Sequence, residues 1–533
     1  MRAEDVGGNG SRRPPACATT PRMAVDPNAL GLAHHARTRP AHPALICGAR
    51  RLSYGELEAR VNRLARALRR AGVGVGGAVG AALHNGPEWF ELLNAVGRIG
   101  ASLVPIGYRL KGPEIAYMLA DSGATVLLAA ADLAAEVDRA AAELAWADAL
   151  RWVVGAAAPA RGRAYEDVLA GESADAFDGA FLGGGFTTLI YTSGTTGRPK
   201  GIERPTDPAS AHLQMLGMAQ MWDLGPDDVT LVAGPCYHTG PASYAQVHLL
   251  IGGTAVILPR FDAAAALAAI ARHRVTNAFM VPTHFSRILQ LDDGERRRHD
   301  LSSLRLVMHS AAPCPPHVKR EIMAIFPLGS VTEFYGASEG GFTRISAEEW
   351  LRKPGSVGLP WPGHEIHVLD ADGAPVRRGE IGLIYVRGPR IVFRYRGAAE
   401  QTRAAFHDGM FTAGDLGWLD EDGYLFIADR RTDLIISGGA NVYPAEVEAV
   451  LMAHPAVADA AVVGIPDAEM GKAVLAVVEL RLGRAASAAE LIAHARQDLA
   501  HYKCPRRVEF VAALPREPQG KVRKHELIER YGG

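Results

Sequence analysis

Short apolar runs alternate with helical patterns from about residue 57 to residue 335, and this alternation limits the fold more than any other feature. The runs are too short for helices; they lie at residues 126–128, 230–232, 255–258, 278–281 and 306–308. Strands that alternate with helices pair in parallel and are covered by helices. We therefore predict an α/β fold with helix-covered parallel sheets.

One helix can be bounded from its residues alone. The segment from Ser53 to Glu56 has the residues of a capping box, in which each side chain bonds the backbone N–H at the other position. Apolar residues then recur at helical spacing from Leu57 to Leu68, and Gly72 is typical of a helix end. We predict an amphipathic surface helix over this range.

The pattern changes near residue 365, where paired strands replace the alternation. Residues 366–369, a turn at Asp-Ala-Asp-Gly over residues 370–373, and residues 384–386 predict one hairpin. Residues 418–419 and 424–427, separated by Asp-Glu-Asp-Gly, predict a second hairpin. These hairpins favour a β-barrel-like part added to the parallel sheets.

A smaller unit follows residue 430. Its expected elements are a helix at 445–452, a helix after a second capping box (Ser487 to Glu490), and strands at 460–463, 474–480 and 508–511. We predict three parts, namely a disordered tail over residues 1–27, a large body over 28–429, and a small, mobile α+β lid over 430–533.

The composition excludes several classes of function. A chain of 533 residues is too long for one hydrophobic core. Its 48% hydrophobic and 22% charged content are typical of a soluble globular protein. A net charge of −1 gives no electrostatic reason to expect nucleic acid or an anionic membrane as partner. No apolar stretch reaches the roughly 18 residues that a transmembrane segment needs.

The cysteines and the N-terminal residues bear on the compartment. The five cysteines are far apart and include no C-x-x-C pair, so neither a disulfide framework nor a zinc site is predicted. The first 22 residues lack the apolar core of a signal peptide. We expect a cytoplasmic protein, with Met23 as an alternative start to Met1.

The segment YTSGTTGRPKG, residues 191–201, follows a predicted buried strand and has the composition of a phosphate-binding loop. Glycines let the backbone approach a polyanion, hydroxyl groups donate hydrogen bonds, and Lys200 supplies positive charge. The spacing of Gly194, Gly197 and Lys200 differs from G-x-x-x-x-G-K-[ST], which excludes the P-loop of kinases and GTPases. From its residues alone, the segment is either a phosphate loop or a solvated surface loop.

This segment resembles the signature of the adenylate-forming superfamily, and four further blocks resemble other motifs of that family in the same order. The blocks are YGASEG at 335–340, TAGDLG at 412–417, DRRTDLIISGG at 429–439 and PREPQGK at 515–521. The resemblance extends from about residue 28 to the C-terminus. It points to the branch of acyl-CoA synthetases and fatty-acid–CoA ligases.

The resemblance implies a two-step activation of a carboxylic acid. A carboxylate is a poor electrophile, but its transfer to AMP creates an acyl adenylate that a thiol can attack. Because the acid and ATP are both anionic, catalysis must supply positive charge and in-line positioning. The implied substrates and cofactors are ATP, Mg²⁺, coenzyme A and a small-molecule carboxylic acid.

The resemblance also assigns nucleotide contacts to residues of each block. The loop is expected to hold the β- and γ-phosphates through Thr192, Ser193, Gly194, Thr195, Thr196, Gly197 and Lys200. Glu339 and Thr196 are expected at Mg²⁺, which prefers oxygen ligands. The rest of the nucleotide is expected to contact Ser310, Ala311, Ala312, Tyr335, Gly336, Ala337, Ser338, Asp415, Ile427 and Arg430. Of these, Tyr335 is expected to stack on adenine, and Asp415 to bind the ribose hydroxyls.

The small domain supplies the lysine expected to catalyse adenylation. By resemblance, Lys521 bridges the carboxylate and the α-phosphate, and the lid then swings about a hinge at Thr432, where many relatives have Asp or Lys. After the swing, Ser437, Gly438 and Gly439 are expected to line the channel for the thiol, because glycines let a chain pass close to the backbone.

The block PCYHTGP, residues 235–241, bears on the acid. Amino-acid-activating relatives have an acidic residue where His238 stands, so an amino acid is not expected. The resemblance places Tyr237, His238, Gly240 and Gly336 around the acyl group, with His238 also in the catalytic set beside Lys521, Thr196 and Glu339. Small residues are expected to leave room for a fatty, branched or aryl acid.

Three alternatives remain open from the sequence. Coenzyme A is the expected thiol acceptor, and an acyl-AMP ligase that loads an acyl carrier protein is the alternative within enzymes. A nucleotide-binding protein without catalysis is the alternative from another class, but the retained Lys200, Glu339, Asp415 and Lys521 argue against it. A homodimer is common among relatives of this kind.

Overall fold

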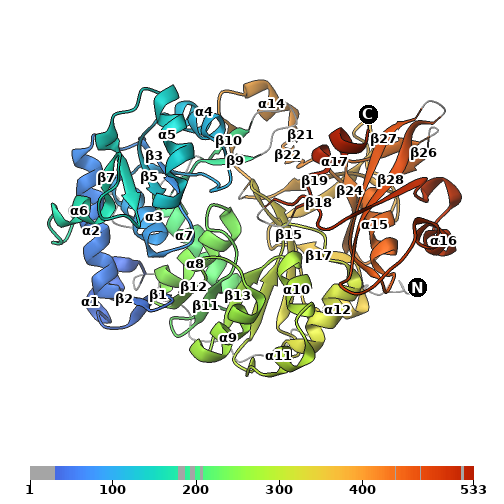
Figure 1. Cartoon of the computed structure of the whole chain (residues 1–533), viewed down its shortest axis with the longest axis horizontal. Helices are drawn as coiled ribbons and strands as arrows, with labels where there is room; N and C mark the ends of the chain where they lie inside the picture. Colours follow the sequence, from blue (N-terminus) through green and yellow to red (C-terminus); the bar gives the residue numbers. More distant parts are fainter. Residues whose placement is uncertain are drawn as a thin grey trace, which may run out of the picture.

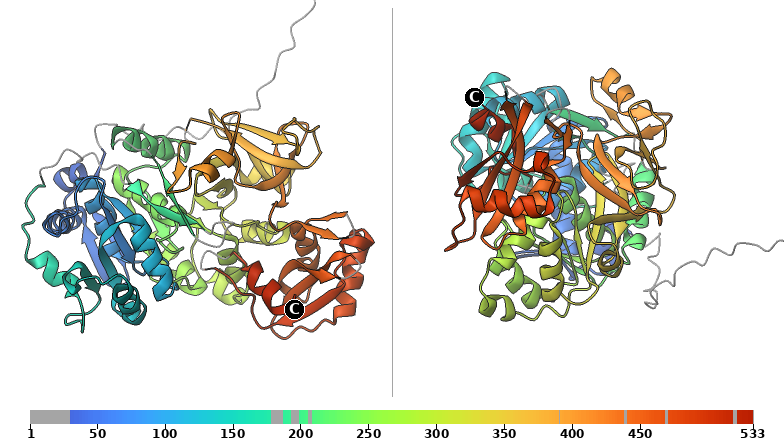
Figure 2. Two further views of the ribbon diagram at one scale, coloured as in Figure 1. Left: turned by 90° about the horizontal axis from the view of Figure 1, so that it is seen from above. Right: turned by 90° about the vertical axis from the view of Figure 1, so that its right-hand side faces the viewer.

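The computed structural model describes residues 30–177, 187–192, 199–204, 208–389, 391–437, 440–467, 470–517 and 521–532, and at residues 187, 192 and 208–213 the backbone alone. The tail predicted over residues 1–27 lies outside these ranges. In Figure 1 an N-terminal sheet (blue) and a C-terminal unit (red) lie at opposite ends, with the second sheet (green to yellow) between them. The left view of Figure 2 shows the same order from above.

The first sheet is parallel and is covered by helices on both faces. Its elements are α2 (Tyr54–Arg70), β3 (Ala78–Ala82), α3 (Pro87–Ile99), β4 (Ser102–Pro105), α4 (Gly112–Ser122), β5 (Ala124–Ala130), α5 (Ala134–Glu143), β6 (Arg151–Val154), β7 (Arg163–Ala164), α6 (Tyr165–Ala170) and β8 (Thr187–Thr188). The strand order is β7-β6-β5-β3-β4-β8. Because side chains of a strand alternate, Leu128 packs with α2, α3 and α6, while Leu127 packs with α4 and α5.

The second sheet has a parallel centre. Its elements are α1 (Leu32–Thr38), β1 (Pro43–Cys47), β2 (Arg50–Ser53), α7 (Pro208–Met221), β11 (Val229–Val232), α8 (Thr239–Ile251), β12 (Thr254–Ile257), α9 (Ala263–His273), β13 (Asn277–Met280), α10 (Pro282–Leu289), α11 (Asp293–Arg297), β14 (Leu306–His309), α12 (Pro316–Ile325) and β15 (Val331–Ala337). Strands β1-β12-β11-β13-β14-β15 are parallel neighbours, and β2 is antiparallel to β1. Helices α9, α10 and α12 share one core with this sheet, and α7 and α8 share another.

Antiparallel strands extend this sheet past β15. They are β16 (Gly340–Ile345), β17 (Ser356–Pro360), β18 (Glu365–Leu369), β19 (Gly382–Arg387), β21 (Phe406–His407), β22 (Met410–Phe411), β23 (Asp415–Leu419) and β24 (Leu425–Arg430), with helices α13 (Ala347–Arg352) and α14 (Ala399–Ala404) between them. The two predicted hairpins are confirmed as β18–β19 and β23–β24. Their inner side chains form a separate core around Phe342 and Phe411.

The C-terminal residues form an α+β unit with its own core. Its elements are β25 (Ile435–Ser437), β26 (Ala440–Val442), α15 (Pro444–Met452), β27 (Val457–Asp467), β28 (Gly471–Leu480), α16 (Ala488–Asp498), β29 (Arg507–Val511) and α17 (Lys524–Tyr531). Strands β27-β28-β29 form one sheet, with α15 and α16 on one face and α17 on the other. Strand β24 belongs to the large sheet and β25 does not, but the division near residue 430 stays a prediction.

The local signals read from the sequence are confirmed where the structure describes them. Both capping boxes form: Glu56 N–H donates to Ser53 Oγ at 3.2 Å, and Glu490 N–H donates to Ser487 Oγ at the same distance. The α/β class is confirmed, as are the strand–helix alternation and the small C-terminal unit. Within the described ranges, no helix combines the length and apolar character needed to cross a membrane.

A buried ion pair holds β15 in place. Lys319 on α12 is fully buried, and its Nζ donates to Glu333 Oε2 at 2.5 Å and lies 4.7 Å from the centre of the Trp350 ring. Burial raises the pKa of Glu333, and the Lys319 charge opposes that shift. Glu333 precedes Tyr335 by two residues, so this pair fixes the strand that carries the predicted adenine contact.

We expect Lys319→Met to lower the free energy of unfolding by about 3 kcal/mol, because it leaves the Glu333 carboxyl buried without its cation. Chemical denaturation measures this loss. The matched control is Arg320→Met, since Arg320 is exposed and lies 5.6 Å from the same Trp350 ring; it should change stability by less than about 0.5 kcal/mol. Equal losses in the two variants would contradict the role of the pair.

Candidate functional site

A three-stranded sheet holds the base of the predicted phosphate loop. Strands β9 (Ile190–Thr192) and β10 (Lys200–Glu203) are antiparallel, with Thr192 opposite Lys200, and β20 (Arg394–Tyr395) pairs with the other side of β10. The Tyr117 hydroxyl donates to the Pro199 carbonyl at 3.0 Å, and the Tyr191 hydroxyl donates to Asp121 Oδ2 at 2.5 Å. Both arms of the loop are therefore anchored. The predicted residues Ser193, Gly194, Thr195, Thr196 and Gly197 lie outside the described ranges, and Thr192 is described by its backbone alone.

Lys200 and Glu339 meet at Tyr395. Lys200 Nζ lies 5.5 Å from the centre of the Tyr395 ring, and the Tyr395 hydroxyl donates to Glu339 Oε1 at 2.8 Å. Burial, together with the Glu339 charge, raises the pKa of Tyr395, so the hydroxyl keeps its proton and donates. Arg204 donates to the Ser338 carbonyl, and its charge acts on Glu339.

The Glu339 carboxylate fits Mg²⁺ that arrives with ATP. It is only 8% exposed, accepts a hydrogen bond from the Tyr395 hydroxyl and interacts with the charge of Arg204, while Lys200 lies on the Tyr395 ring. Mg²⁺ needs one or two carboxylates and takes its other ligands from phosphates and water. The described residues include no group of three or more His, Cys, Asp or Glu side chains placed to hold a metal. A cation bound mainly through the nucleotide is the kind that these residues suit.

Asp415 joins two strands that the sequence placed in different blocks. In the β23–β24 pair Asp415 lies opposite Arg430, whose Nε donates to Asp415 Oδ1 at 3.1 Å. From β15, the Tyr335 hydroxyl donates to Asp415 Oδ2 at 2.7 Å. Burial and the Asp415 charge raise the pKa of Tyr335. Each carboxylate oxygen has two lone pairs, so Asp415 can accept ribose hydroxyls in addition to these bonds.

The small residues predicted beside adenine lie next to β15. Ser310, Ala311 and Ala312 follow β14 at its carboxyl end, and β14 pairs directly with β15. Ligands of open α/β sheets bind at this edge. Ala311 has φ 76°, a left-handed conformation that is uncommon for residues other than glycine and occurs often at functional sites. Gly336, Ala337 and Ser338 continue from Tyr335 at the end of β15, and Ile427 lies in β24, half-buried against the same core.

Lys521 lies close to the Asp415 cluster. Burial and the charge of Arg430 lower the pKa of Lys521, while Glu517, Asp433 and Asp415 oppose this shift. These interactions place the segment carrying Lys521 near Asp415, at the start of β23, and near Arg430, at the end of β24. The same segment reaches the predicted acyl residues, because the Glu517 charge acts on Tyr237. Three positions distant in sequence therefore share one electrostatic environment.

The predicted hinge and thiol-channel residues lie between β24 and β26. Thr432 is exposed in the turn after β24, and its hydroxyl donates to Asp433 Oδ1 at 3.2 Å. Backbone hydrogen bonds hold the turn: Arg431 N–H donates to the Gly414 carbonyl at 2.9 Å, and Asp433 N–H donates to the Arg430 carbonyl at 3.0 Å. Ser437 ends β25 opposite Ala440 of β26, and the intervening Gly438 and Gly439 lie outside the described ranges.

The predicted acyl residues lie at the start of α8 and the end of β15. Tyr237 is buried, and His238 precedes α8 with its ring 4.3 Å from that of Tyr237. The volume expected beside Gly240 is filled, because a Cβ there would lie 2.5 Å from the Phe279 ring. A Cβ at Gly336 would lie 2.5 Å from the Gly340 carbonyl oxygen. At these two positions glycine therefore permits close packing instead of leaving an empty space.

Sequence reasoning missed three kinds of residue at this site. Tyr395, which joins Lys200 to Glu339, stands in the segment RYRG and belongs to no motif; only the pairing of β20 with β10 brings it there. Arg204 follows the loop block by three residues but carries no pattern of its own. The aromatic side chains around Phe279 and Trp361 come from four separate segments, so no local signal could have grouped them.

Comparisons with known proteins agree with this geometry. The family model described as AMP-binding enzyme matches residues 32–396, and the model described as AMP-binding enzyme C-terminal domain matches residues 446–521. A feruloyl-CoA synthase of Amycolatopsis sp is 36% identical over 506 residues, covering 93% of this chain and 97% of that protein. ScoC of Streptomyces coeruleorubidus, a fatty acid–[acyl-carrier-protein] ligase, is 31% identical and covers 94% of this chain and 95% of its own.

A solved structure matches both the fold and the arrangement of its parts. ATP-bound MatB from Rhodopseudomonas palustris is 33% identical, covers 93% of this chain and 98% of its own, and superposes with a TM-score of 0.82. The apo form of MatB from the same organism gives a TM-score of 0.71. The family models, the relatives and the fold agree. The chain belongs to the AMP-binding enzymes, the adenylate-forming superfamily, and within it to the acyl-CoA synthetase branch of AMP-forming acid–CoA ligases.

Proposed function

We propose that this enzyme converts an apolar carboxylic acid into its acyl adenylate with release of pyrophosphate, and then into a coenzyme A thioester with release of AMP. One observation carries the proposal. Lys521 from the lid lies in the electrostatic environment of Asp415 and Arg430 of the body. Tyr335, which donates to Asp415, precedes Glu339 by four residues, and Tyr395 joins Glu339 to Lys200. Cations from both lobes thus converge where two anionic substrates must meet.

In the first step, a carboxylate oxygen of the acid attacks the α-phosphorus of ATP, and the bond from that phosphorus to the pyrophosphate oxygen breaks. We propose that Lys521 stabilises the negative charge that accumulates between the two anions. We propose that Lys200 binds the departing phosphates and that Asp415 binds the ribose. Tyr335 holds Asp415 in orientation through its hydrogen bond. Mg²⁺, held by Glu339 and by Thr196 of the loop, would neutralise phosphate charge.

In the second step, the thiol of coenzyme A loses its proton and its sulfur attacks the acyl carbon, and AMP leaves with the electron pair of the acyl carbon–oxygen bond. The position of Lys521 supports an adenylation arrangement in this structure, and the higher TM-score to ATP-bound than to apo MatB agrees with that. We propose that the lid, residues 430–533, turns at Thr432 to withdraw Lys521. The exposure of Arg431 and Thr432 in a short turn between the two parts suits such a hinge.

The acid and the acceptor are narrower proposals. Feruloyl-CoA synthase is a relative that acts on an aryl acid by its name, while ScoC is named for a carrier-protein acceptor. We propose an apolar fatty, branched or aryl acid, because Tyr237 is buried and the residues that line the small cavity beside Tyr237 and His238 are mostly apolar. Coenzyme A is the proposed acceptor, and a carrier protein is the second candidate. A homodimer and a cytoplasmic location stay predictions.

We expect Asp415→Asn to raise the KM for ATP by about 10- to 100-fold, because it removes the charge that accepts the ribose hydroxyls and two side-chain donors. Acid-dependent ATP–pyrophosphate exchange measures this change. Asp370→Asn is the matched control, since Asp370 is an exposed turn carboxylate that accepts backbone N–H groups. An unchanged KM for ATP in Asp415→Asn would contradict the ribose assignment.

We expect Lys521→Ala to slow adenylation by about 100- to 1,000-fold and to leave the reaction of supplied acyl adenylate with coenzyme A close to wild type. The charged lysine is the active form and its pKa is lowered, so adenylation should fall as pH rises through that lowered pKa. The second half-reaction should lack this alkaline loss. Lys472→Ala, an exposed lysine on β28, is the control. Equal slowing of both half-reactions would contradict the proposed lid exchange.

We expect thioester formation with coenzyme A to exceed that with acyl carrier protein, and Gly439→Trp to block it while pyrophosphate exchange continues. The physical reason is that a bulky side chain would obstruct the proposed passage for the pantetheine arm. Mass spectrometry of the thioester products measures both acceptors. Faster loading of the carrier protein would reverse the assignment. If the protein binds ATP but catalyses no pyrophosphate exchange with any of the acids tested, the proposed enzymatic activity is contradicted.

A further inference from the structure

Four aromatic side chains lie directly behind the predicted acyl residues. We call them the aromatic wall: Trp222, Phe279, Phe334 and Trp361. The ring centres are 6.0 Å apart for Phe279 and Phe334, and 6.1 Å apart for Phe334 and Trp361. Trp222 lies 6.2 Å from Phe334 and 6.4 Å from Trp361. Each ring is in contact range of the next, so the four form one continuous surface.

Two glycines, Gly240 and Gly341, pack directly against rings of this wall. The Phe279 ring occupies the place where a side chain of Gly240 would begin, and the benzo edge of the Trp361 indole occupies the corresponding place at Gly341. Gly240 is a residue proposed for the acyl group, and Gly341 belongs to the strand paired with Gly336. The wall therefore lies one side chain behind the backbone that is proposed to contact the acid.

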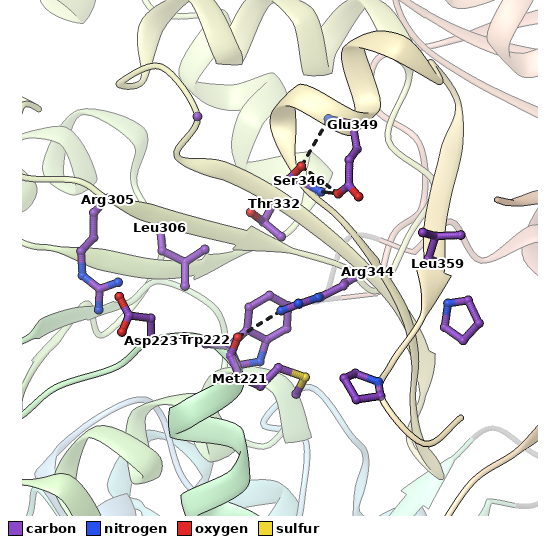
Figure 3. Close-up of a pocket in the computed structure, with 13 residues that line it drawn as sticks. Met221, Trp222, Asp223, Arg305, Leu306, Thr332, Arg344, Ser346, Glu349 and Leu359 are labelled. Carbon is purple, nitrogen blue, oxygen red and sulfur yellow. Dashed lines mark hydrogen bonds between the residues drawn. The ribbon is translucent and has the colours of Figure 1, made fainter. Parts of the chain in front are cut away.

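Through Trp222, the wall also borders a cavity that we call the outer cavity. This outer cavity has a volume of about 490 Å³ and is lined by residues that include Trp222, Leu306, Arg344, Pro360 and Pro362 (Figure 3). Pro360 and Pro362 flank Trp361 and face the outer cavity, whereas the Trp361 ring lies against Gly341. Trp222 belongs both to the aromatic wall and to the lining of the outer cavity. It is 5% exposed, and Arg344 lies over its ring at 5.8 Å and donates to the Met221 carbonyl at 3.1 Å.

The two neighbours Phe334 and Tyr335 separate the functions of β15. Phe334 packs into the core that holds α7 and α8, on the side of the wall. Tyr335 packs toward the other core and donates to Asp415. The strand thus presents one ring to the acyl side and the next to the nucleotide side. A change in the wall can therefore alter acid selection without removing a nucleotide contact.

On the basis of the proposed function, we propose that the aromatic wall ends the acyl pocket and closes it from the outer cavity, so that the enzyme selects compact, ring-bearing acids and rejects long unbranched ones. A planar ring can pack edge-to-face or offset against the wall. A long chain has no path past it, because interiors are packed closely and a blocked pocket rejects added methylenes. Opening the wall would add the outer cavity to the pocket.

The test is ATP–pyrophosphate exchange with two series of acids, one of benzoic, phenylacetic and cinnamic acids and one of octanoic, dodecanoic and hexadecanoic acids. In wild type, we expect kcat/KM to fall by about 100-fold or more from cinnamic to hexadecanoic acid. In Trp361→Ala, the ratio of hexadecanoic to cinnamic acid should rise by about 10-fold or more. Trp222→Ala should shift the ratio in the same direction, because Trp222 belongs to the aromatic wall and also lines the outer cavity.

The matched control is Trp418→Ala. Trp418 stacks on Phe426 at 4.1 Å in the β23–β24 hairpin, outside the aromatic wall, and its removal should leave the ratio at the wild-type value. Thermal melts confirm that each variant is folded. If Trp361→Ala does not fold, Trp361→Leu opens part of the same passage and should give a smaller shift of the same sign.

Two results would overturn the proposed role of the aromatic wall without affecting the proposed function. One is a wild-type enzyme that uses hexadecanoic acid as well as cinnamic acid. The other is a set of folded variants at Trp361 and Trp222 whose ratio equals that of wild type. Absence of exchange with every acid in wild type is a different outcome, because it would overturn the proposed function and with it the wall.

Discussion

Charge convergence on the Asp415 carboxylate connects the parts of this enzyme. Arg430 reaches it along the β23–β24 pair, Tyr335 reaches it from β15, and Lys521 of the C-terminal unit lies within its electrostatic field. A carboxylate that is 6% exposed needs such partners, because an isolated buried charge is costly. The Asp415 charge thus interacts with residues of the body and of the C-terminal unit, beside the proposed nucleotide site. Moving the C-terminal unit away would remove Lys521 from the residues around Asp415.

The phosphate side of the site depends on a different arrangement. Tyr117 and Tyr191 hold the two arms of the loop, while Tyr395 places its hydroxyl on Glu339 and its ring beside Lys200. Burial keeps the Tyr395 hydroxyl protonated by raising its pKa. Described side chains therefore anchor the chain on both sides of the glycine-rich segment.

The acyl side uses packing in place of charge. Gly240 and Gly341 admit aromatic rings where side chains would otherwise begin, and the rings stand between the proposed acid site and an outer cavity. Because β15 sends Phe334 to this packing and Tyr335 to the nucleotide cluster, one strand serves both substrates. The proposed wall can thus select the acid by its shape without changing the positions of the residues proposed to act at the α-phosphate. In the proposed function, charge positions the reacting groups, and the aromatic wall limits which acids can bind.

The sequence by itself determined the α/β class, the capped helix after Ser53, the hairpins after residue 365 and the blocks that carry Lys200, Glu339, Asp415 and Lys521. These follow from local periodicity, turn residues and motif spacing, which short-range physics sets. Only the tertiary structure decided that Tyr395 joins Lys200 to Glu339, and that glycines at 240 and 341 receive rings. Such contacts depend on which strands become neighbours and on what fills the space between them, and residues far apart in a chain carry no local signal of either.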